Sequence, residues 1–217
     1  MKKGLSRFKI ENIGFDRLAT DGWRLQQDTL ARQDRLNSMS QKEWETTCIS
    51  GLDLPGFEVF GALLDGQMAA AAIVCRIDNI YCVPYAMSHS RFLRDHVNNA
   101  LFFSMSCELL NRENTSGIFF TVESLDAPPH VDEFKLRMGF KPVPVRQNVV
   151  LNPLIPSISI PAVHSLICSL QKQYPSASTI SKIEGMLRFY REGKRPNHEQ
   201  SIPECIKNKI EHSETVS

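Results

Sequence analysis

The stretch Phe134-Lys-Leu-Arg-Met-Gly-Phe140 decides the fold, and the apolar run Lys141-Pro-Val-Pro-Val-Arg-Gln-Asn-Val-Val-Leu151 follows it at once. Apolar side chains at Phe134, Leu136 and Met138 indicate a short helix. We expect the helix to end at Gly139, because glycine adopts the left-handed backbone that terminates helices without a steric penalty. Phe140 is then expected to open a β-strand.

Upstream of this stretch, the hydrophobic period predicts an ordered series of elements. Two helices are expected within residues 16–50, before any strand, and the second opens with a capping box from Ser40 to Glu43. The Asp65-Gly66 pair between two alternating runs predicts a hairpin. The elements expected next are strands at 57–64, 68–77 and 79–87, a polar basic loop at 88–96, a helix at 97–111, a strand buried on both faces at 117–122, and the helix at 131–138. The predicted fold class is therefore α/β (α+β), with a mainly antiparallel central sheet flanked by helices.

The composition of the sequence changes past Leu151, where prolines recur and exclude a continuous helix. Two helical patterns follow, at 162–173 and 178–191, and the chain then becomes polar. We therefore predict a domain at 1–153, a Pro-rich connector with a helical appendage at 154–192, and a flexible tail at 193–217. The roles left open for the appendage are a homodimer contact, substrate gating or neither.

Composition narrows the function classes. The 217 residues carry 25 Lys and Arg against 24 Asp and Glu, so the net charge of the chain does not indicate nucleic-acid binding. No run reaches the roughly 20 apolar residues of a membrane helix, and no apolar segment follows the basic start, so we expect a cytoplasmic protein. The six cysteines lack metal-ligand spacing, so we expect no metal site and small buried thiols, with a nucleophilic cysteine as the alternative.

The phrase that ends at Gly139-Phe140 resembles the one that closes a helix before the last strands in GNAT-type acyltransferases. Residues 98–101, 123–125, 133–140 and 144–147 together resemble a narrower bacterial group, similar to the Fem-type transferases that build peptidoglycan cross-bridges. The superfamily resemblance implies a GNAT-like fold and an acyltransferase that uses acetyl-CoA or another acyl-CoA. The narrower one implies aminoacyl-tRNA as an alternative donor.

GNAT enzymes bind the coenzyme pyrophosphate on backbone N–H groups at the start of the central helix, through a glycine-containing phrase. The corresponding residues 90–99 contain no glycine. The side chains of Arg91 and Arg94 are therefore expected to contact phosphate, beside Asn98 and Asn99 at the helix start. The alternative is a solvated basic loop in which Asn98 or Asn99 caps the helix.

Glu123 and Ser124 are the predicted catalytic residues, because they stand where a strand emerges at the edge on which open α/β sheets bind ligands. Glu123 would remove a proton from an attacking amine, or instead cap a turn or form an ion pair. Ser124 would donate to the oxyanion, or simply end the strand. Strand residues 82–86, with Val83 and Tyr85 placed at the acyl-CoA site, would polarise the carbonyl through backbone amides.

Arg146 is the predicted contact for a substrate anion, with an ion pair to Glu133 or Asp132 as the alternative. His164 lies within an apolar helical pattern and is expected to be a capping or partly buried residue. The function predicted from these residues is transfer of an acyl group from acyl-CoA to the amine of a small molecule, amino sugar or peptide. The alternatives are a tRNA-dependent transferase and a non-catalytic binding or scaffold module in envelope polysaccharide metabolism.

Overall fold

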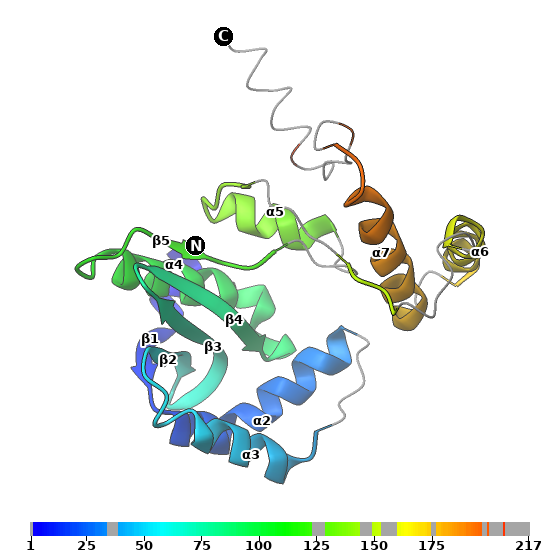
Figure 1. The fold of residues 1–217 in the computed structure, drawn as a ribbon. Coiled ribbons are helices and arrows are strands. Elements are labelled where there is room, and N and C mark those ends of the chain that lie inside the picture. Colours follow the sequence, from blue (N-terminus) through cyan, green and yellow to red (C-terminus); the bar gives the residue numbers. More distant parts are fainter. Residues whose placement is uncertain are drawn as a thin grey trace. The chain divides into compact units, whose positions relative to one another are not determined.

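A computed structural model of the chain describes residues 2–33, 39–122, 129–143, 149–152, 160–174, 177–196, 199 and 206 (Figure 1). The chain forms two compact units, residues 1–121 and 122–217, and each is described by itself. The boundary predicted after residue 153 falls outside the described residues and stays a prediction, as does the tail predicted at 193–217.

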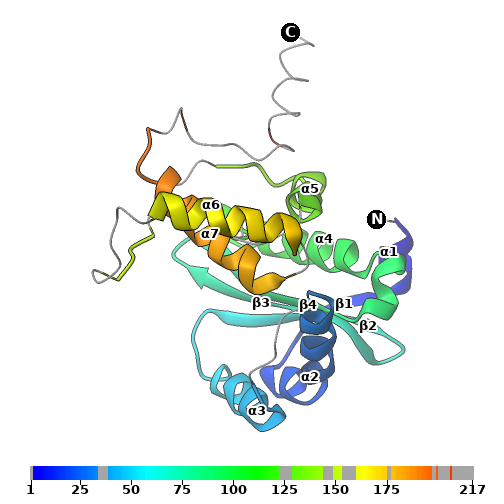
Figure 2. The same ribbon diagram turned by 90° about the vertical axis from the view of Figure 1, so that its right-hand side faces the viewer.

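The first unit is a five-stranded sheet with helices on both faces. Its strands follow the order β1 to β5, and β1 to β4 pair antiparallel while β5 runs parallel to β4. The strands are β1 (Lys9–Ile13), β2 (Phe57–Leu64), β3 (Gln67–Ile77), β4 (Ile80–Ser88) and β5 (Gly117–Phe119). The helices are α1 (Lys2–Arg7), α2 (Phe15–Arg32), α3 (Gln41–Ser50), the 3₁₀ helix η1 (Ser90–Asp95) and α4 (Val97–Leu110). Helices α2 and α3 cover one face and α4 the other (Figure 2), which confirms the predicted fold class.

The expectation of two helices before any strand is wrong, because α1 and β1 precede them. Strand β1 pairs with β2 along five residues, from Lys9 opposite Leu63 to Ile13 opposite Val59. Only Ile13 of this edge strand is fully buried. A five-residue strand with one buried position leaves too little alternation to be recognised from the sequence.

The hairpin between β2 and β3 forms as predicted. Asp65 and Gly66 have φ values of 49° and 79°. Positive φ at both central residues is the requirement of the type I′ turn, whose twist matches that of the flanking strands. The Asp-Gly pair therefore fixes where β2 ends and β3 begins.

The capping box at the start of α3 also forms as predicted. The Ser40 side chain accepts from the Glu43 N–H at 3.3 Å, and the Glu43 carboxylate accepts from the Ser40 N–H at 2.7 Å. Because both bonds stabilise the first turn, Ser40→Ala is expected to lower the free energy of unfolding by about 1 kcal/mol. Urea denaturation followed by circular dichroism measures this change.

The control for that variant is Ser50→Ala at the other end of α3, where the hydroxyl donates only to the Thr46 carbonyl on the helix surface. Its effect should be smaller, and equal losses from the two variants would contradict the capping role. The bonds from Ser40 lower the pKa of the Glu43 carboxyl. A lowered folded-state pKa means that the contribution is present at neutral pH and lost as the pH falls through that pKa.

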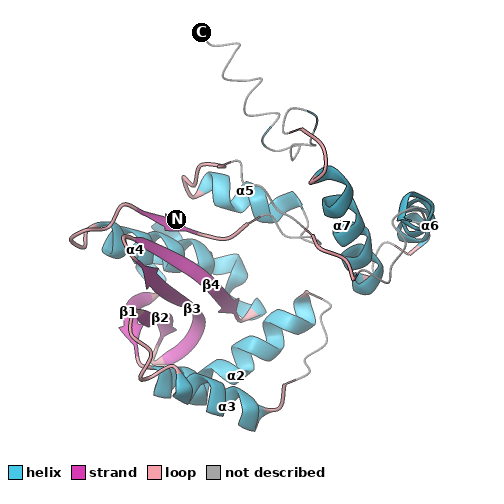
Figure 3. Ribbon diagram, in the orientation of Figure 1, coloured by secondary structure: helices cyan, strands magenta, loops and turns pink. Residues whose placement is uncertain are grey.

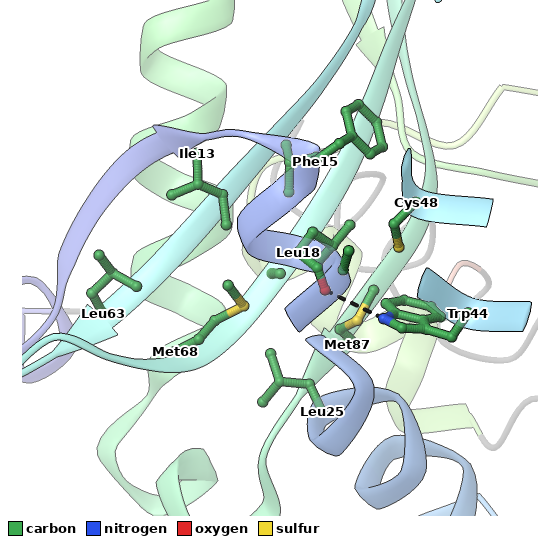
Figure 4. Packing of buried hydrophobic residues seen from close by; sticks show 12 residues of the cluster. Ile13, Phe15, Leu18, Leu25, Trp44, Cys48, Leu63, Met68 and Met87 are labelled. Atoms are coloured by element: carbon green, nitrogen blue, oxygen red, sulfur yellow. Dashed lines mark hydrogen bonds between the residues drawn. The ribbon is translucent and has the colours of Figure 1, made fainter. Parts of the chain in front are cut away.

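One buried core of the first unit lies between the sheet and the α2–α3 pair (Figure 4), and α4 buries further apolar residues on the other face. The buried cluster comprises Ile13, Phe15, Leu18, Ala19, Leu25, Trp44, Cys48, Val59, Leu63, Met68, Ala71 and Met87. The indole N–H of Trp44 donates to the Leu18 carbonyl at 3.3 Å, so the one polar atom of this large side chain has a partner.

On the opposite face, Arg112 joins the end of α4 to the sheet. Its guanidinium donates to both carboxylate oxygens of Glu58 on β2, at 2.5 and 2.9 Å, to the Tyr81 hydroxyl on β4 at 3.1 Å, and to Glu108 at 2.7 Å. The bonds to Glu58 are the main cause of the raised pKa of Arg112. This network fixes α4 against the strands that it covers.

The second unit contains α5 (Pro129–Arg137), α6 (Ile160–Gln173) and α7 (Ser178–Glu192), all three of which were predicted. Helix α5 ends as expected, since Gly139 has φ 93° and the N–H groups of Gly139 and Phe140 donate to Leu136 and Lys135 at 3.1 Å. This pair of hydrogen bonds is the Schellman motif.

No helix in the described part of the chain is long and apolar enough to cross a bilayer.

The strand predicted from Phe140 to Leu151 is wrong where it can be assessed. Residues 140–143 and 149–152 are not in a strand (Figure 3), and residues 144–148 lie outside the described part. Prolines at 142 and 144 remove two N–H donors from this segment, which weakens its capacity to pair.

Candidate functional site

The candidate site begins at the outer edge of β4. Strand β5 pairs with β4 only from Ile80 opposite Gly117 to Cys82 opposite Phe119, whereas β4 continues to Ser88. In the part of the chain that the structure describes, no strand pairs with this edge beyond Cys82. The strand predicted at 117–122 forms, but it stops at Phe119, and the expected burial on both faces is wrong because that side chain is 45% exposed.

A β-bulge lies at the point where the edge opens. Cys82 faces Cys75 and Tyr85 faces Ile73, so two residues of β4, Val83 and Pro84, oppose one residue of β3. Proline has no N–H to lose from a ladder and is therefore found on edges and at bulges. Bulges of this kind re-aim the backbone and are frequent beside active sites.

The bulge reverses which face of the sheet each side chain takes. Tyr81 and Tyr85 are four residues apart and would share a face in a regular strand. Instead, the Tyr81 hydroxyl accepts from Arg112 at the end of α4, and the Tyr85 hydroxyl accepts from Gln26 of α2 at 2.7 Å. The site therefore starts where β4 changes its pleat.

Beyond the bulge, the register selects Ala86 as the outward donor. The His89 N–H donates to the Ala69 carbonyl at 2.9 Å, so by alternation the amides of Met87 and Tyr85 also face β3, and those of Ser88 and Ala86 face the open edge. The Ser88 N–H is taken by the Thr29 hydroxyl at 3.0 Å. The Ala86 N–H is thus the amide that this stretch of β4 directs to the edge.

This geometry refines the assignment of strand residues 82–86. Tyr85, placed at the acyl-CoA site from the sequence, turns its N–H toward Ile73 and leaves its ring 40% exposed. Val83 lies in the bulge and is buried. The sequence alone could not single out Ala86 within residues 82–86, because the bulge that sets the register has no signal beyond Pro84.

The second part of the candidate site is the start of α4. The polar loop predicted at 88–96 is largely the 3₁₀ helix η1, which carries the exposed side chains of Arg91 and Arg94. The N-cap of α4 is His96, with φ 61° and no side-chain cap, so capping by Asn98 or Asn99 is wrong. The first α-helical bond runs from the Ala100 N–H to the His96 carbonyl, so the N–H groups of Val97 and Asn98 at the first positions of α4 precede the ladder, as anion-binding helix ends require.

Helix α1 packs against this helix start, a contact that the sequence did not predict. A Cβ on Gly4 would lie 2.7 Å from the His96 carbonyl oxygen and 3.1 Å from the Ala100 Cβ, so only glycine permits the approach. The Lys3 ammonium and the Arg7 guanidinium lie 3.0 and 2.9 Å from the Asp95 carboxylate. The hydrogen bond from Lys3 is the largest cause of the lowered pKa of Asp95.

The predicted catalytic residues Glu123 and Ser124, and the predicted anion contact Arg146, lie outside the described residues. Their roles stay predictions. Asp132 pairs with Lys135 at 3.0 Å and Glu133 with Arg137 at 3.1 Å, so both carboxylates offered as ion-pair partners of Arg146 have cations on their own helix.

The thiols differ from one another in exposure. Cys48 is buried, and burial raises its pKa to about 11. Burial is also the largest cause of the raised pKa of Cys75. Cys107 is exposed, so the expectation of buried thiols is wrong there. An activated thiol needs a lowered pKa, and Cys48 and Cys75 shift in the opposite direction.

Comparison with known proteins supports the fold. No protein-family model matches the sequence, and no curated protein matches it. An aminoglycoside acetyltransferase from an uncultured soil metagenomic sample, solved with trehalose, matches with TM-score 0.53 and 14% identity over 68% of this chain and 98% of its own. Aminoglycoside N-acetyltransferase AAC(6')-Iy in complex with CoA matches with TM-score 0.51 and 10% identity, over 67% of this chain and 93% of its own.

The ribosomal-protein-S18-alanine N-acetyltransferase from Escherichia coli matches with TM-score 0.50 and 18% identity, over 67% of this chain and 85% of its own. At these identities the likeness concerns the backbone. Membership of the Fem-type group stays a prediction. The chain has the fold of the GNAT acetyltransferases over about two thirds of its length.

Proposed function

We propose that the protein is an N-acyltransferase that moves an acyl group from acyl-CoA to an amine. The observation that carries this proposal is the bulged edge of β4, which no strand among the described residues pairs with beyond Cys82, in a fold shared with an acetyltransferase solved with CoA. A thioester carbonyl laid along that edge would accept a hydrogen bond from the Ala86 N–H. Such a donor stabilises the negative charge that develops on the oxygen during acyl transfer.

The remaining steps use predicted residues. The amine nitrogen attacks the acyl carbon, an N–C bond forms, and the C–S bond breaks to release the coenzyme as a thiolate, which takes up a proton from solvent. The amine must lose a proton during attack, and we assign that proton to the Glu123 carboxylate. Ser124 would be a second donor to the developing oxyanion. Arg146 would contact an anionic group of the acceptor.

The coenzyme phosphates would bind at the start of α4. The N–H groups of Val97 and Asn98 and the positive end of the helix dipole favour an anion there. Arg91 and Arg94, exposed on the preceding turn, would supply charge where glycines would otherwise let the phosphates approach the backbone. Asn98 and Asn99 are the predicted helix residues beside the phosphates.

Calorimetric titration with acetyl-CoA and longer acyl-CoAs tests this function. Arg91→Ala and Arg94→Ala are each expected to weaken binding by about 1–2 kcal/mol, roughly five- to thirtyfold in Kd, because each removes a charge-assisted hydrogen bond. Arg24→Ala, which removes an exposed arginine from α2, is the control and should leave Kd unchanged. Absence of binding at millimolar acyl-CoA would overturn the use of this coenzyme.

The acceptor is proposed to be an amine of a small molecule, an amino sugar or a peptide. The matched structures include enzymes named for aminoglycosides and for a ribosomal protein, which are amines of these kinds. An aminoacyl-tRNA donor is the alternative that the Fem-type resemblance implies. A cytoplasmic location and a homodimer remain predictions from the sequence.

A non-catalytic binding or scaffold module is the second candidate. Two observations favour it: residues 90–99 contain no glycine, and α1 packs Gly4 against the His96 carbonyl at the proposed phosphate site. A folded protein that binds no acyl-CoA and transfers no acetyl group to a panel of amines would support this candidate over the enzyme.

A further inference from the structure

The segment from α6 through the turn that follows α7 is more basic than the chain as a whole. Residues 160–196 contain six Lys and Arg residues against two Glu residues, whereas the whole chain carries a net charge of +1. Helices α6 and α7 pack against each other within the second unit (Figure 2). Arg188 and Arg191 lie on one side of α7, and Arg195 follows in a turn closed by its N–H donating to the Glu192 carbonyl at 2.9 Å.

These three arginines surround a small pocket. Arg188, Arg191 and Arg195 line a cavity of about 80 Å³ together with His164 and Glu192. That volume equals roughly two to three water molecules, the size of one tetrahedral anion. Three guanidinium groups line the pocket beside the Glu192 carboxylate, and the Glu184 carboxylate lies next to Arg188, so cations outnumber carboxylates by three to two.

His164 contacts both Arg191 and Glu184 beside the pocket. The Arg191 guanidinium lies 2.6 Å from His164 Nδ1, and because a guanidinium only donates, Nδ1 is the acceptor. His164 Nε2 then carries the ring proton and donates to the Glu184 carboxylate at 3.3 Å, and that carboxylate also lies 3.6 Å from Arg188 Nε. Glu184 and His164 thus orient two guanidinium groups beside the pocket, and the partial burial predicted for His164 is confirmed.

The same neighbourhood does not suit a metal ion. His164, Cys168 and Glu184 have potential ligand atoms within 4.8 Å of one another. A metal-bound imidazole normally donates its other N–H to an acceptor, whereas here Nδ1 faces a donor. The nearby guanidinium groups would also repel a cation.

We propose that this pocket binds a phosphate group, as the free ion or as a phosphate monoester. A dianion can take two or more guanidinium forks at once, and Arg191 commits one of its five N–H groups to His164. The planar fork of arginine matches the oxygens of phosphate. A carboxylate of similar size carries a smaller negative charge than the phosphate dianion, so we expect it to bind more weakly.

Calorimetric titration of the full chain with inorganic phosphate tests the proposal, with acetate as the carboxylate comparison. Arg191→Gln and Arg195→Gln are each expected to weaken phosphate binding by about tenfold or more. Arg195→Gln leaves the His164–Arg191 and Glu184–Arg188 contacts intact, so it remains informative if Arg191→Gln unfolds the α6–α7 pair. Lys182→Gln removes a cation of α7 that does not line the pocket, so the affinity of this variant for phosphate should equal that of the parent protein.

Three results would overturn the proposal: no saturable phosphate binding, equal loss in all three variants, or binding of Zn²⁺ that is abolished by Cys168→Ser. A parallel titration with CoA identifies the source of the phosphate. If Arg195→Gln weakens CoA as it weakens phosphate, the group belongs to the coenzyme. If CoA binding is unchanged while phosphate binding falls, the pocket serves a separate phosphate-bearing ligand.

Discussion

Ala86→Pro is expected to lower the rate constant for acetyl transfer by about 10²–10³-fold, the usual loss when one oxyanion donor is removed. The N–H of residue 86 faces the open edge of β4, so proline there deletes the proposed donor without breaking a bond between β3 and β4. Because Pro84 already occupies this strand, a further proline is tolerable on the same edge. Steady-state kinetics with acetyl-CoA and an amine acceptor measures the change.

Ala86→Ser is the matched control, because it keeps the N–H and adds one polar atom at an exposed position. Its rate should stay within a few-fold of the parent. Circular dichroism and thermal unfolding check that the proline variant is folded. A folded Ala86→Pro protein with undiminished turnover would remove Ala86 from the mechanism, and the open edge would then need another role.

Local chemistry with a fixed spacing was predictable from the sequence. The Asp65-Gly66 turn, the Ser40 capping box and the Gly139 helix end each depend on residues within six positions of one another, and all three form. Each motif satisfies its backbone groups locally, so its sequence signal survives whatever surrounds it.

Features that depend on distant contacts were not predictable. The bulge at Val83 arises from the pairing of β4 with β3, and it alone determines that Ala86 faces outward. The docking of α1 depends on Gly4 meeting His96, far along the chain. Neither pairing has a local pattern, so the sequence assigned the backbone amides of residues 82–86 as a group and could not single out that of Ala86.

Trp44→Ala is expected to lower the free energy of unfolding by about 3–5 kcal/mol, a large part of the 5–15 kcal/mol typical of a domain. Trp44 is 5% exposed, donates to the Leu18 carbonyl, and packs at 6.4 Å from the ring of Trp23. Its removal opens a cavity between α3 and α2 that the two helices cannot close without moving. Urea denaturation followed by circular dichroism and by the fluorescence of the remaining Trp23 measures the loss.

Trp44→Phe separates volume from hydrogen bonding, since it retains a ring but no N–H, and it should cost about 1–2 kcal/mol. A loss from Trp44→Ala no larger than that from Trp44→Phe would show that the ring is not a main support of the core.

The buried cluster that contains Trp44 also contains Met87, which follows Ala86 directly on β4. Because the Met87 side chain anchors that strand from the α2–α3 face, a cavity at Trp44 should loosen the edge on which the proposed oxyanion donor lies. Transfer by Trp44→Ala should therefore fall even at temperatures where the protein remains folded, whereas Ser40→Ala, at the surface of α3, should leave transfer unchanged.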